Sequence, residues 1–297
     1  MAVGGRPKGG QSPDIDDTQF DDWTDLLEQR FGIFIAPERK SFLASRLRMR
    51  MRETGCKDYR EYYHRISRGV SQAKEWSLLV DCLTVHETCF FRHASSLKFV
   101  EEVVLPDAFR RGDGFNVWSI GCATGEEAYS LAMLADAYCS EREESSGYGV
   151  TGTDISLPAL RDARSGVYSN RRLANISAQF QAKYTRTVSE DRFEIAASLR
   201  QRVCFAQLNL RDVDKAPFAG MDLIFCQNVL IYFDRESRMK VVDSLVEFLR
   251  PGGVIVLGPG ELLNWQHPKI RKVRYADTLA YQRIQEQARD AGSKELK

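Results

Sequence analysis

The sequence lacks several features that would assign it to a specialised class of protein. None of its apolar runs approaches the ~20 residues of a membrane-spanning helix, and its N-terminus has no apolar signal-peptide core. The formal net charge is only +1, so no global field favours nucleic acid. Seven cysteines are an odd count without CxxC spacing, which favours reduced thiols. We therefore expect a cytoplasmic protein with no membrane insertion and no nucleic-acid partner.

What is present indicates two folded parts. The 297 residues are 43% hydrophobic, enough for one large domain or two smaller ones. Residues 1–18 are rich in Gly, Pro and Asp and predict a disordered lead-in. Apolar residues then recur at helical spacing, and no strand pattern precedes Phe115. We predict an all-helical N-terminal domain over 19–94, a second domain over 95–286 and a tail over 287–297.

The helical part contains a one-sided basic run. Between Arg39 and Arg52 there is no acid. Such a run is often only a solvated helix face, but its one-sidedness makes an acidic partner about equally plausible. The candidate docking residues are Arg46, Arg48, Arg50 and Arg52.

From Phe115 onward, strand-like and helix-like segments alternate. This alternation predicts an α/β fold with a doubly wound, mostly parallel sheet covered on both faces. After Arg271, two short strands joined near Ala276 predict an antiparallel edge hairpin, and a polar, strand-like stretch predicts a small β insertion at about 180–201. The candidate parallel strands span 115–121, 148–155, 202–210, 221–229 and 253–258, and the candidate helices span 126–138, 157–165 and 237–249.

The most informative stretch is FNVWSIGCATGEEAYS, residues 115–130. A buried strand, a turn containing Gly121 and a helix would open a nucleotide-binding βαβ unit. The acids Glu126 and Glu127 disfavour a pyrophosphate there, and no GxGxxG pattern supports a nicotinamide-dependent dehydrogenase. A cationic ligand without phosphate, S-adenosylmethionine, fits better. Adjacent first-turn side chains diverge, so we expect only one glutamate to face the ligand, the other interacting with the helix dipole.

The ends of the other strands carry polar residues that should converge, because ligands of open α/β sheets bind there. Asp154 follows the second strand and could hold two ribose hydroxyls, although it could equally cap the next helix. The third and fourth strands end at Asn209-Leu210 and Asn228-Val229, where each Asn could be a simple turn residue.

One metal-like pattern is rejected. Cys82, His86, Cys89 and His93 have ligand types that zinc prefers. On one helix, however, the outer pair would lie about 16 Å apart, too far to share an ion. We predict no metal site.

Taken together, these motifs resemble the CheR family of chemotaxis-receptor glutamate O-methyltransferases, from Phe20 to about Ile284. The motifs are the basic helix, LTVHETCFFR (83–92), SIGCATGEEAYSLA (119–132), TDIS (153–156), RSGVY (164–168), FAQLNL (205–210), FCQNVLIYFD (225–234) and LRPGGVIVLGPGE (249–261). The resemblance implies a class I methyltransferase that uses S-adenosylmethionine and releases S-adenosylhomocysteine. Its partner would be the cytoplasmic helical domain of methyl-accepting chemoreceptors.

The resemblance also implies roles for individual residues. Arg92 and Tyr232 would be catalytic, with Tyr232 near the transferable methyl. Where the family usually has Asn, this chain has His86. The implied cofactor contacts are His86, Thr88, Arg92, Gly121, Glu127 or less readily Glu126, Asp154, Asn209, Leu210, Asn228 and Val229.

The β insertion bears on receptor docking. Family members that grip a C-terminal receptor pentapeptide have a longer, Gly-rich loop there, whereas YTRTVSEDRFEI (184–195) is short and has no Gly. The chain therefore resembles the pentapeptide-independent type. A rival interpretation of another class is a non-catalytic cofactor-binding scaffold or sensor of the same fold.

Overall fold

The computed structural model describes residues 14–68, 72–85, 87–142 and 147–285. Its contacts divide the chain into two units, Met1–Val85 and His86–Lys297. The second unit thus begins before residue 95, and Phe90 already packs into its core. Among the described residues, no helix has the length and apolar character needed to cross a membrane.

The described part of the N-terminal unit is all-helical, as expected. Asp16 begins α1 with a capping box, and Gly32 ends it in the left-handed conformation. Gly55 ends α2 in the same way. The α-helices are α1 (Asp17–Phe31), α2 (Lys40–Thr54), α3 (Tyr59–Arg68) and α4 (Ala73–Leu83), and a short 3₁₀ helix, η1 (Pro37–Arg39), precedes α2. Their shared core contains Trp23, Leu27, Leu43, Leu47, Tyr62 and Leu79, each at most 1% exposed.

The second unit is built on a seven-stranded sheet in the order β6-β2-β1-β7-β8-β10-β9. The first five of these strands are parallel and the last two antiparallel, which confirms the predicted α/β class. The strands are β1 (Phe115–Ile120), β2 (Tyr148–Asp154), β6 (Val203–Gln207), β7 (Met221–Cys226), β8 (Leu249–Leu257), β9 (Ile270–Tyr275) and β10 (Thr278–Arg283).

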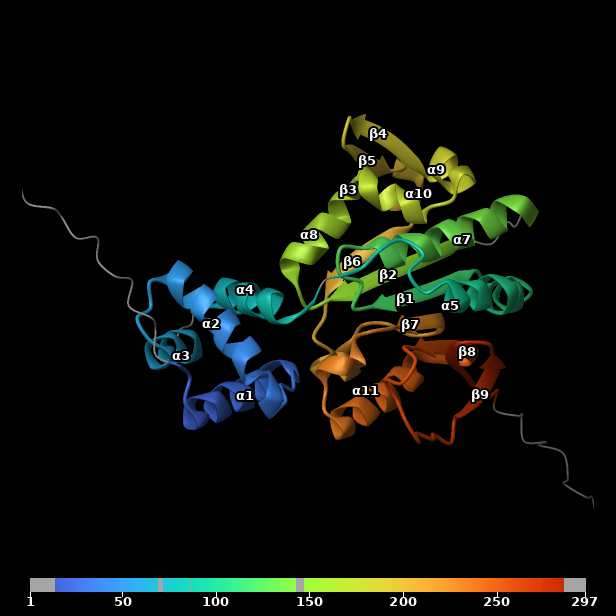
Figure 1. Ribbon diagram of the computed structural model, residues 1–297. Coiled ribbons are helices and arrows are strands. Elements are labelled where there is room, and N and C mark those ends of the chain that lie inside the picture. Colours follow the sequence, from blue (N-terminus) through green and yellow to red (C-terminus); the bar gives the residue numbers. More distant parts are fainter. Residues whose placement is uncertain (1–13, 69–71, 86, 143–146, 286–297) are drawn as a thin grey trace, which may run out of the picture. The chain divides into compact units, whose positions relative to one another are not determined.

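Helices cover both faces of this sheet, so the strands are buried on both sides (Figure 1). Phe115 and Val117 of β1 face one core, which includes residues of α7 and α8, whereas Trp118 and Ile120 face the other, which includes α11. The helices of the unit are α5 (Ala94–Phe99), η2 (Val100–Val104), α6 (Leu105–Phe109), α7 (Glu126–Arg142), α8 (Leu157–Ser165), α11 (Arg235–Phe248) and the 3₁₀ turns η4 (Leu210–Lys215) and η5 (Leu230–Tyr232).

The predicted edge hairpin is present. Strand β9 pairs with β10, and β10 pairs with β8, so the hairpin extends the parallel sheet by two antiparallel strands. Thr278 lies opposite Tyr275, and Asp277 in the connecting turn has a positive φ of 53°. Ser95 of α5 donates to the carbonyl of Ala276 in this turn at 2.5 Å.

The β insertion forms a separate three-stranded sheet in the order β3-β5-β4 (Figure 1). It takes in β3 (Val167–Ser169), which lies before the expected start at 180, because a three-residue strand is too short to give a period-2 signal. Its other elements are η3 (Asn170–Asn175), α9 (Ala178–Tyr184), β4 (Thr185–Ser189), β5 (Arg192–Ile195) and α10 (Ala197–Arg200).

Candidate cofactor and active site

The turn after β1 is tied directly to the end of β2. Its backbone has positive φ at Gly121 (67°), Ala123 (46°) and Gly125 (94°), a conformation that favours glycine. The N–H of Cys122 donates to the carbonyl of Thr153, and the N–H of Ala123 donates to the Asp154 carboxylate at 2.9 Å. These bonds hold the first two strand ends side by side.

Asp154 is an organiser of this edge and not a helix cap. Its second oxygen accepts from the N–H of Ser156 at 2.8 Å, and it is Ser156 that caps α8 by accepting from Ala159. A carboxylate has about four lone-pair sites, so more than two donors can share the Asp154 side chain. The capping alternative for Asp154 is therefore wrong, and a ligand-binding role remains open.

The two glutamates at the start of α7 have different surroundings, as expected for adjacent helix positions. Glu126 is fully buried and forms an ion pair with Arg172 of η3, and the Thr124 hydroxyl donates to it at 2.6 Å. Arg172 also donates to the carbonyl of Thr88. Glu126 therefore ties the β1 turn to the insertion and to the segment that carries Thr88.

Glu127 points to another environment. Its oxygen accepts from the Ser119 hydroxyl at 2.7 Å. Burial and, to a smaller extent, the neighbouring Glu261 carboxylate raise the pKa of Glu127 to about 8, against the lowering effects of Ser119 and of the Arg92 guanidinium. A partly buried carboxylate with a nearby cation and no ion pair of its own among the described residues is suited to a positively charged ligand.

The end of β7 contains strained and unpartnered groups. Asn228 has a positive φ of 60°, and its buried side-chain oxygen has no hydrogen-bond partner in the described part of the chain. Val229 lies so close to Gly121 that a Cβ there would overlap its methyl group. Before them, Gln227 donates to the Ser96 hydroxyl at 2.8 Å. This loop therefore packs against both the β1 turn and α5.

The proposed catalytic pair lies on two different segments. Arg92 is exposed, and its guanidinium donates to the carbonyl of Glu87 at 2.5 Å while acting electrostatically on Glu127. Tyr232 ends the 3₁₀ turn η5 and is half-buried. His86 lies outside the described residues.

The third parallel strand, expected over 202–210, ends earlier in the structure. Strand β6 ends at Gln207, two residues before Asn209, and Asn209 caps η4 by accepting from the N–H of Arg211 at 3.1 Å. Leu210 is buried, with 8% of its surface exposed. Asn209 thus has the turn role that was one of its two alternatives, which does not exclude a further contact.

Sequence reasoning missed two residues at this edge. Glu261 follows β8 and is 4% exposed, and the signal that could have found it is the same strand-end rule applied to the fifth strand. His93 approaches the Asn228 side chain, and burial lowers its pKa, so the imidazole is neutral at pH 7. The sequence singled out His93 only as part of the rejected metal-like pattern, and nothing in that pattern indicated a contact with Asn228.

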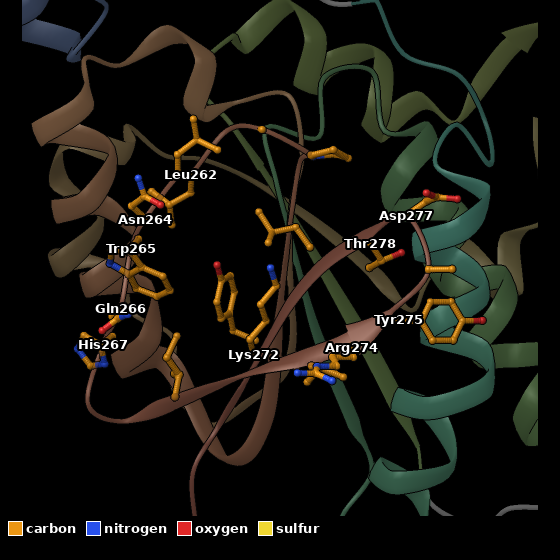
Figure 2. Close-up of a pocket in the computed structure, with 18 residues that line it drawn as sticks. Leu262, Asn264, Trp265, Gln266, His267, Lys272, Arg274, Tyr275, Asp277 and Thr278 are labelled. Atoms are coloured by element: carbon orange, nitrogen blue, oxygen red, sulfur yellow. The ribbon is translucent and has the colours of Figure 1, made fainter.

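A groove of about 1310 Å³ lies beside this edge and not at its centre. Figure 2 shows it between the loop carrying Leu262, Trp265 and His267 and the β9–β10 hairpin, with Lys272 directed between the two. Gly260 and Asp277 place one end of the groove next to the strand ends. We assign it no function.

The basic run of α2 is less uniform than its sequence indicates, and the expectation for Arg50 needs correction. Arg50 is 5% exposed and binds Glu75 through two hydrogen bonds of 3.0 and 2.9 Å, with Glu53 at 2.6 Å. Arg50 is buried and already paired, so it cannot dock a partner. The run itself did not show this, because both acids lie outside it. Arg48 is also engaged, with the Tyr59 hydroxyl and Asp14.

The remaining candidates of the run are more accessible. Arg46 is half-buried and stacks over the Phe42 ring at 5.1 Å, and Arg52 is exposed. All seven cysteines are free. Across the residues that the structure describes, no group of three or more His, Cys, Asp and Glu side chains could hold a metal ion.

The donors and acceptors of the strand-end edge fit S-adenosylmethionine. That cofactor presents ribose hydroxyls, an adenine amino group and an ammonium as donors, together with a sulfonium. The edge offers the Asp154 and Glu127 carboxylates and the unpartnered oxygens of Asn228 and Glu261. This group of carboxylate and amide oxygens suits a cationic ligand and not a diphosphate.

Fold and site together define an S-adenosylmethionine-dependent methyltransferase, and comparison with known proteins gives the family. The family model "CheR methyltransferase, SAM binding domain" matches residues 86–279, and "CheR methyltransferase, all-alpha domain" matches 18–84. The chain belongs to the CheR methyltransferase family.

Curated relatives span most of the chain. Chemotaxis protein methyltransferase 2 of Vibrio cholerae is 33% identical over 84% of this chain and 87% of that protein. The chemotaxis protein methyltransferases of Escherichia coli K12 and Borreliella burgdorferi are 31% and 29% identical, over 85% and 80% of this chain and 86% of each relative. The expected family and cofactor are thereby confirmed.

Proposed function

We propose that the protein transfers the methyl group of S-adenosylmethionine to glutamate side chains in the cytoplasmic helical domain of chemoreceptors. The products are glutamate methyl esters and S-adenosylhomocysteine, as in adaptation of a chemotaxis-type pathway. The observation that carries the proposal is the strand-end edge, where buried acids and unpartnered acceptors gather in a chain that belongs to the CheR family. The related proteins are named as chemotaxis methyltransferases, which supports this substrate class.

Methyl transfer to a glutamate needs little acid–base chemistry from the protein. A free glutamate side chain has a pKa near 4.3 and is an anion at pH 7, so no strong general base is required. When bound, the cofactor supplies the electrophilic methyl. The chain's own residues therefore act by aligning the incoming carboxylate and excluding water. Arg92 as a fixed cation and Tyr232 as a hydroxyl donor are suited to orient that carboxylate.

We assign the cofactor contacts by the surroundings of each residue. We place the ribose hydroxyls at Asp154, whose carboxylate is fixed at the end of β2 by two backbone N–H groups, and Glu127 is the better candidate for the methionine ammonium. Glu126 is the weaker candidate, since its carboxylate is already engaged by Arg172 and Thr124. The remaining proposed contacts are Thr88, Arg92, Gly121, Asn209, Leu210, Asn228, Val229 and, outside the described residues, His86.

We place receptor docking on two features. The accessible arginines of α2, Arg46 and Arg52, would meet an acidic receptor helix. In the insertion, β4 ends at Ser189 and β5 begins at Arg192, so the turn between them is short and has no glycine. A turn of this length favours the pentapeptide-independent type.

The test is methyl transfer from tritiated S-adenosylmethionine to a purified receptor cytoplasmic domain. Esters hydrolyse in mild alkali and release tritiated methanol, whereas methylated amines do not, so alkali-labile label identifies the glutamate ester. Cofactor binding without label transfer would favour the non-catalytic scaffold. Alkali-stable label would contradict the glutamate assignment.

Tyr232→Phe separates alignment from binding. If the hydroxyl only orients the substrate carboxylate, kcat should fall about 10- to 100-fold while the Kd for S-adenosylhomocysteine changes by less than about threefold. Calorimetry measures the second quantity. A variant with full turnover would remove Tyr232 from the mechanism.

A further inference from the structure

Phe91 has a backbone conformation that is unusual for its side chain, and it lies directly before Arg92. Its φ is +54°, in the left-handed region, where a bulky residue is an outlier. Such a conformation persists only where the surrounding structure imposes it, and it is found most often at functional sites. Phe91 must therefore be held by its neighbours, and the next side chain whose direction it sets is that of Arg92.

A serine of α7 holds the backbone of Phe91. Ser130 is fully buried, and its hydroxyl oxygen accepts from the N–H of Phe91 at 3.0 Å. The same hydroxyl donates to the carbonyl of Glu126, one helical turn earlier, at 2.6 Å. Because its proton is directed at that carbonyl, the hydroxyl acts toward Phe91 as an acceptor. Ser130 thus connects α7 to the residue before Arg92.

Other contacts hold the residues around this bond. Phe90 is fully buried in the core of the second unit. The Phe91 ring packs against the ring of Phe180 in α9, with the ring centroids 5.7 Å apart. Earlier in the segment, Arg172 donates to the carbonyl of Thr88 at 2.9 Å. The backbone is therefore held on both sides of Phe91 before the chain reaches Arg92.

These contacts direct one charged side chain outward. We call residues 88–92 the arginine segment, in which Arg92 is the only exposed residue. Its guanidinium donates to the carbonyl of Glu87 at 2.5 Å. Orienting a substrate carboxylate requires the guanidinium in one place, since a displacement of about 1 Å can cost a large factor in rate. A fixed backbone at Phe91 meets that requirement.

We propose that Ser130 is a positioning residue for Arg92: its hydroxyl holds Phe91 in the left-handed conformation and thereby sets the direction in which the Arg92 side chain leaves the arginine segment. The catalytic role of Arg92 rests on the proposed function, whereas the conformation of the segment can be tested without a receptor. Ser130 acts through the backbone and does not contact the reacting atoms.

The first test measures this hold by amide hydrogen exchange in Ser130→Ala and in the control Ser67→Ala. Ser67 of α3 also donates to the carbonyl four residues earlier, at 2.7 Å, so its variant removes the same intrahelical bond in another part of the chain. Peptides that cover the arginine segment should exchange about tenfold faster in Ser130→Ala and at the wild-type rate in Ser67→Ala. Unchanged exchange in Ser130→Ala would overturn the proposal.

Phe91→Gly and Phe91→Ala test the conformation with Ser130 in place, and they keep the proposal testable if Ser130→Ala does not fold. Both variants lose the ring, but only glycine adopts a positive φ without steric cost. The kcat of label transfer per folded molecule should therefore be about threefold or more higher for Phe91→Gly than for Phe91→Ala. Equal values, or the reverse order, would overturn the proposal.

The matched control for this pair is Asp277, which has a φ of 53° in the β9–β10 turn. Asp277→Gly and Asp277→Ala also differ in left-handed strain, so they should differ in unfolding temperature and have the same kcat. A difference in kcat at Asp277 as large as that at Phe91 would show that strain acts on activity through stability alone, and would overturn the proposal.

A double-mutant cycle then asks whether Ser130 acts through Arg92. At saturating cofactor and receptor, Ser130→Ala should lower kcat per folded molecule by about tenfold or more. In the Arg92→Ala background the same change should cost a clearly smaller factor, and an equal factor would overturn the proposal. Should the wild-type protein fail to methylate receptors, the proposed function fails, yet hydrogen exchange still tests whether Ser130 holds the arginine segment.

Discussion

Buried polar groups lie at both ends of strand β7, but the two ends differ in the partners that these groups have. At its start, Asp222 is held by Arg111 at 2.5 Å, by Arg250 at 2.6 Å and by the N–H of Asn116 at 2.8 Å. Just past its end, Asn228 has a strained backbone and a buried oxygen without a hydrogen-bond partner among the described residues. The strand is the same, but the carboxylate at its start is paired with two arginines, whereas the Asn228 oxygen past its end has no hydrogen-bond partner among the described residues.

This difference distinguishes a carboxylate that stabilises the fold from a carboxylate that can bind a ligand. A buried carboxylate that serves the fold must be paired, because an unpaired one costs several kcal/mol. At the ligand-binding end, the Glu127 and Glu261 carboxylates lie near each other with Arg92 as the nearby cation, and burial, with a smaller effect of Glu261, raises the pKa of Glu127. Such an arrangement is stable only to the extent that backbone N–H groups or a ligand compensate it.

The largest effect on binding is expected for Asp154→Ala. The change should remove two ribose hydrogen bonds to an anion, each worth about 1.5–3 kcal/mol at most, and release the N–H groups of Ala123 and Ser156. The Kd for S-adenosylhomocysteine should rise by at least tenfold, measured by calorimetry. Unchanged affinity would remove Asp154 from the site.

At the other end of the sheet, Asp222→Asn should act on the fold alone. Breaking a buried pair while leaving Arg111 and Arg250 in place costs about 3–5 kcal/mol of unfolding free energy. Denaturant unfolding measures the loss. The Kd for S-adenosylhomocysteine in native buffer should be unchanged, and a weaker affinity would show that the two ends of β7 are coupled.

The sequence predicted the sheet well and the site only in part. The longer strands and helices could be predicted because each carries its own periodic pattern of apolar residues. β3 has only three residues and was not recognised as a strand. Asp154 was correctly expected at the end of a strand, whereas β7 ends at Cys226, two residues before Asn228. Both residues lie at the same edge because the topology of a parallel sheet brings the strand ends together.

What could not be predicted depends on contacts between distant residues. Arg50 belongs to a run without acids, yet Glu75 from α4 removes it from the surface. Glu126 and Glu127 are adjacent in sequence, yet Arg172 pairs with Glu126 while Ser119 donates to Glu127. Local pattern carries no information about such ion-pair partners, which lie some 25 to 46 residues apart along the chain.

Glu127 provides a pH-dependent comparison between the two glutamates. Its pKa is raised to about 8 in the free protein, so its carboxyl is largely protonated at pH 7, and a cationic ligand must displace that proton. Affinity for S-adenosylmethionine should therefore rise from pH 6 to 8, by up to about tenfold per unit, and then level off. Calorimetry in buffers of different ionisation enthalpy should detect the released proton.

The control is Glu127→Gln, which should bind more weakly at pH 8 and lose the pH dependence. The same shift predicts a stability effect of definite sign. Because the folded-state pKa lies above the ordinary value of 4.5, the ligand-free protein should lose stability as pH rises from there through about 8, and the variant should lose less. An unchanged pH profile in the variant would assign the dependence to another group.

The smallest effect is expected for Arg46 and Arg52 of α2, whose charges are more accessible to solvent than the buried charges beside β7. Arg46→Glu with Arg52→Glu should reduce receptor methylation at low salt and flatten its salt dependence, because exposed pairs contribute only about 0.2–1 kcal/mol each and are screened over ~8–10 Å. Arg50 is left intact, since its pairing with Glu75 would confuse docking with unfolding. Receptor lacking its last residues should be methylated as well as the full-length form. If the double charge reversal leaves methylation unchanged across a salt series, Arg46 and Arg52 are only solvated surface. If methylation requires the receptor tail, the pentapeptide-independent assignment is wrong.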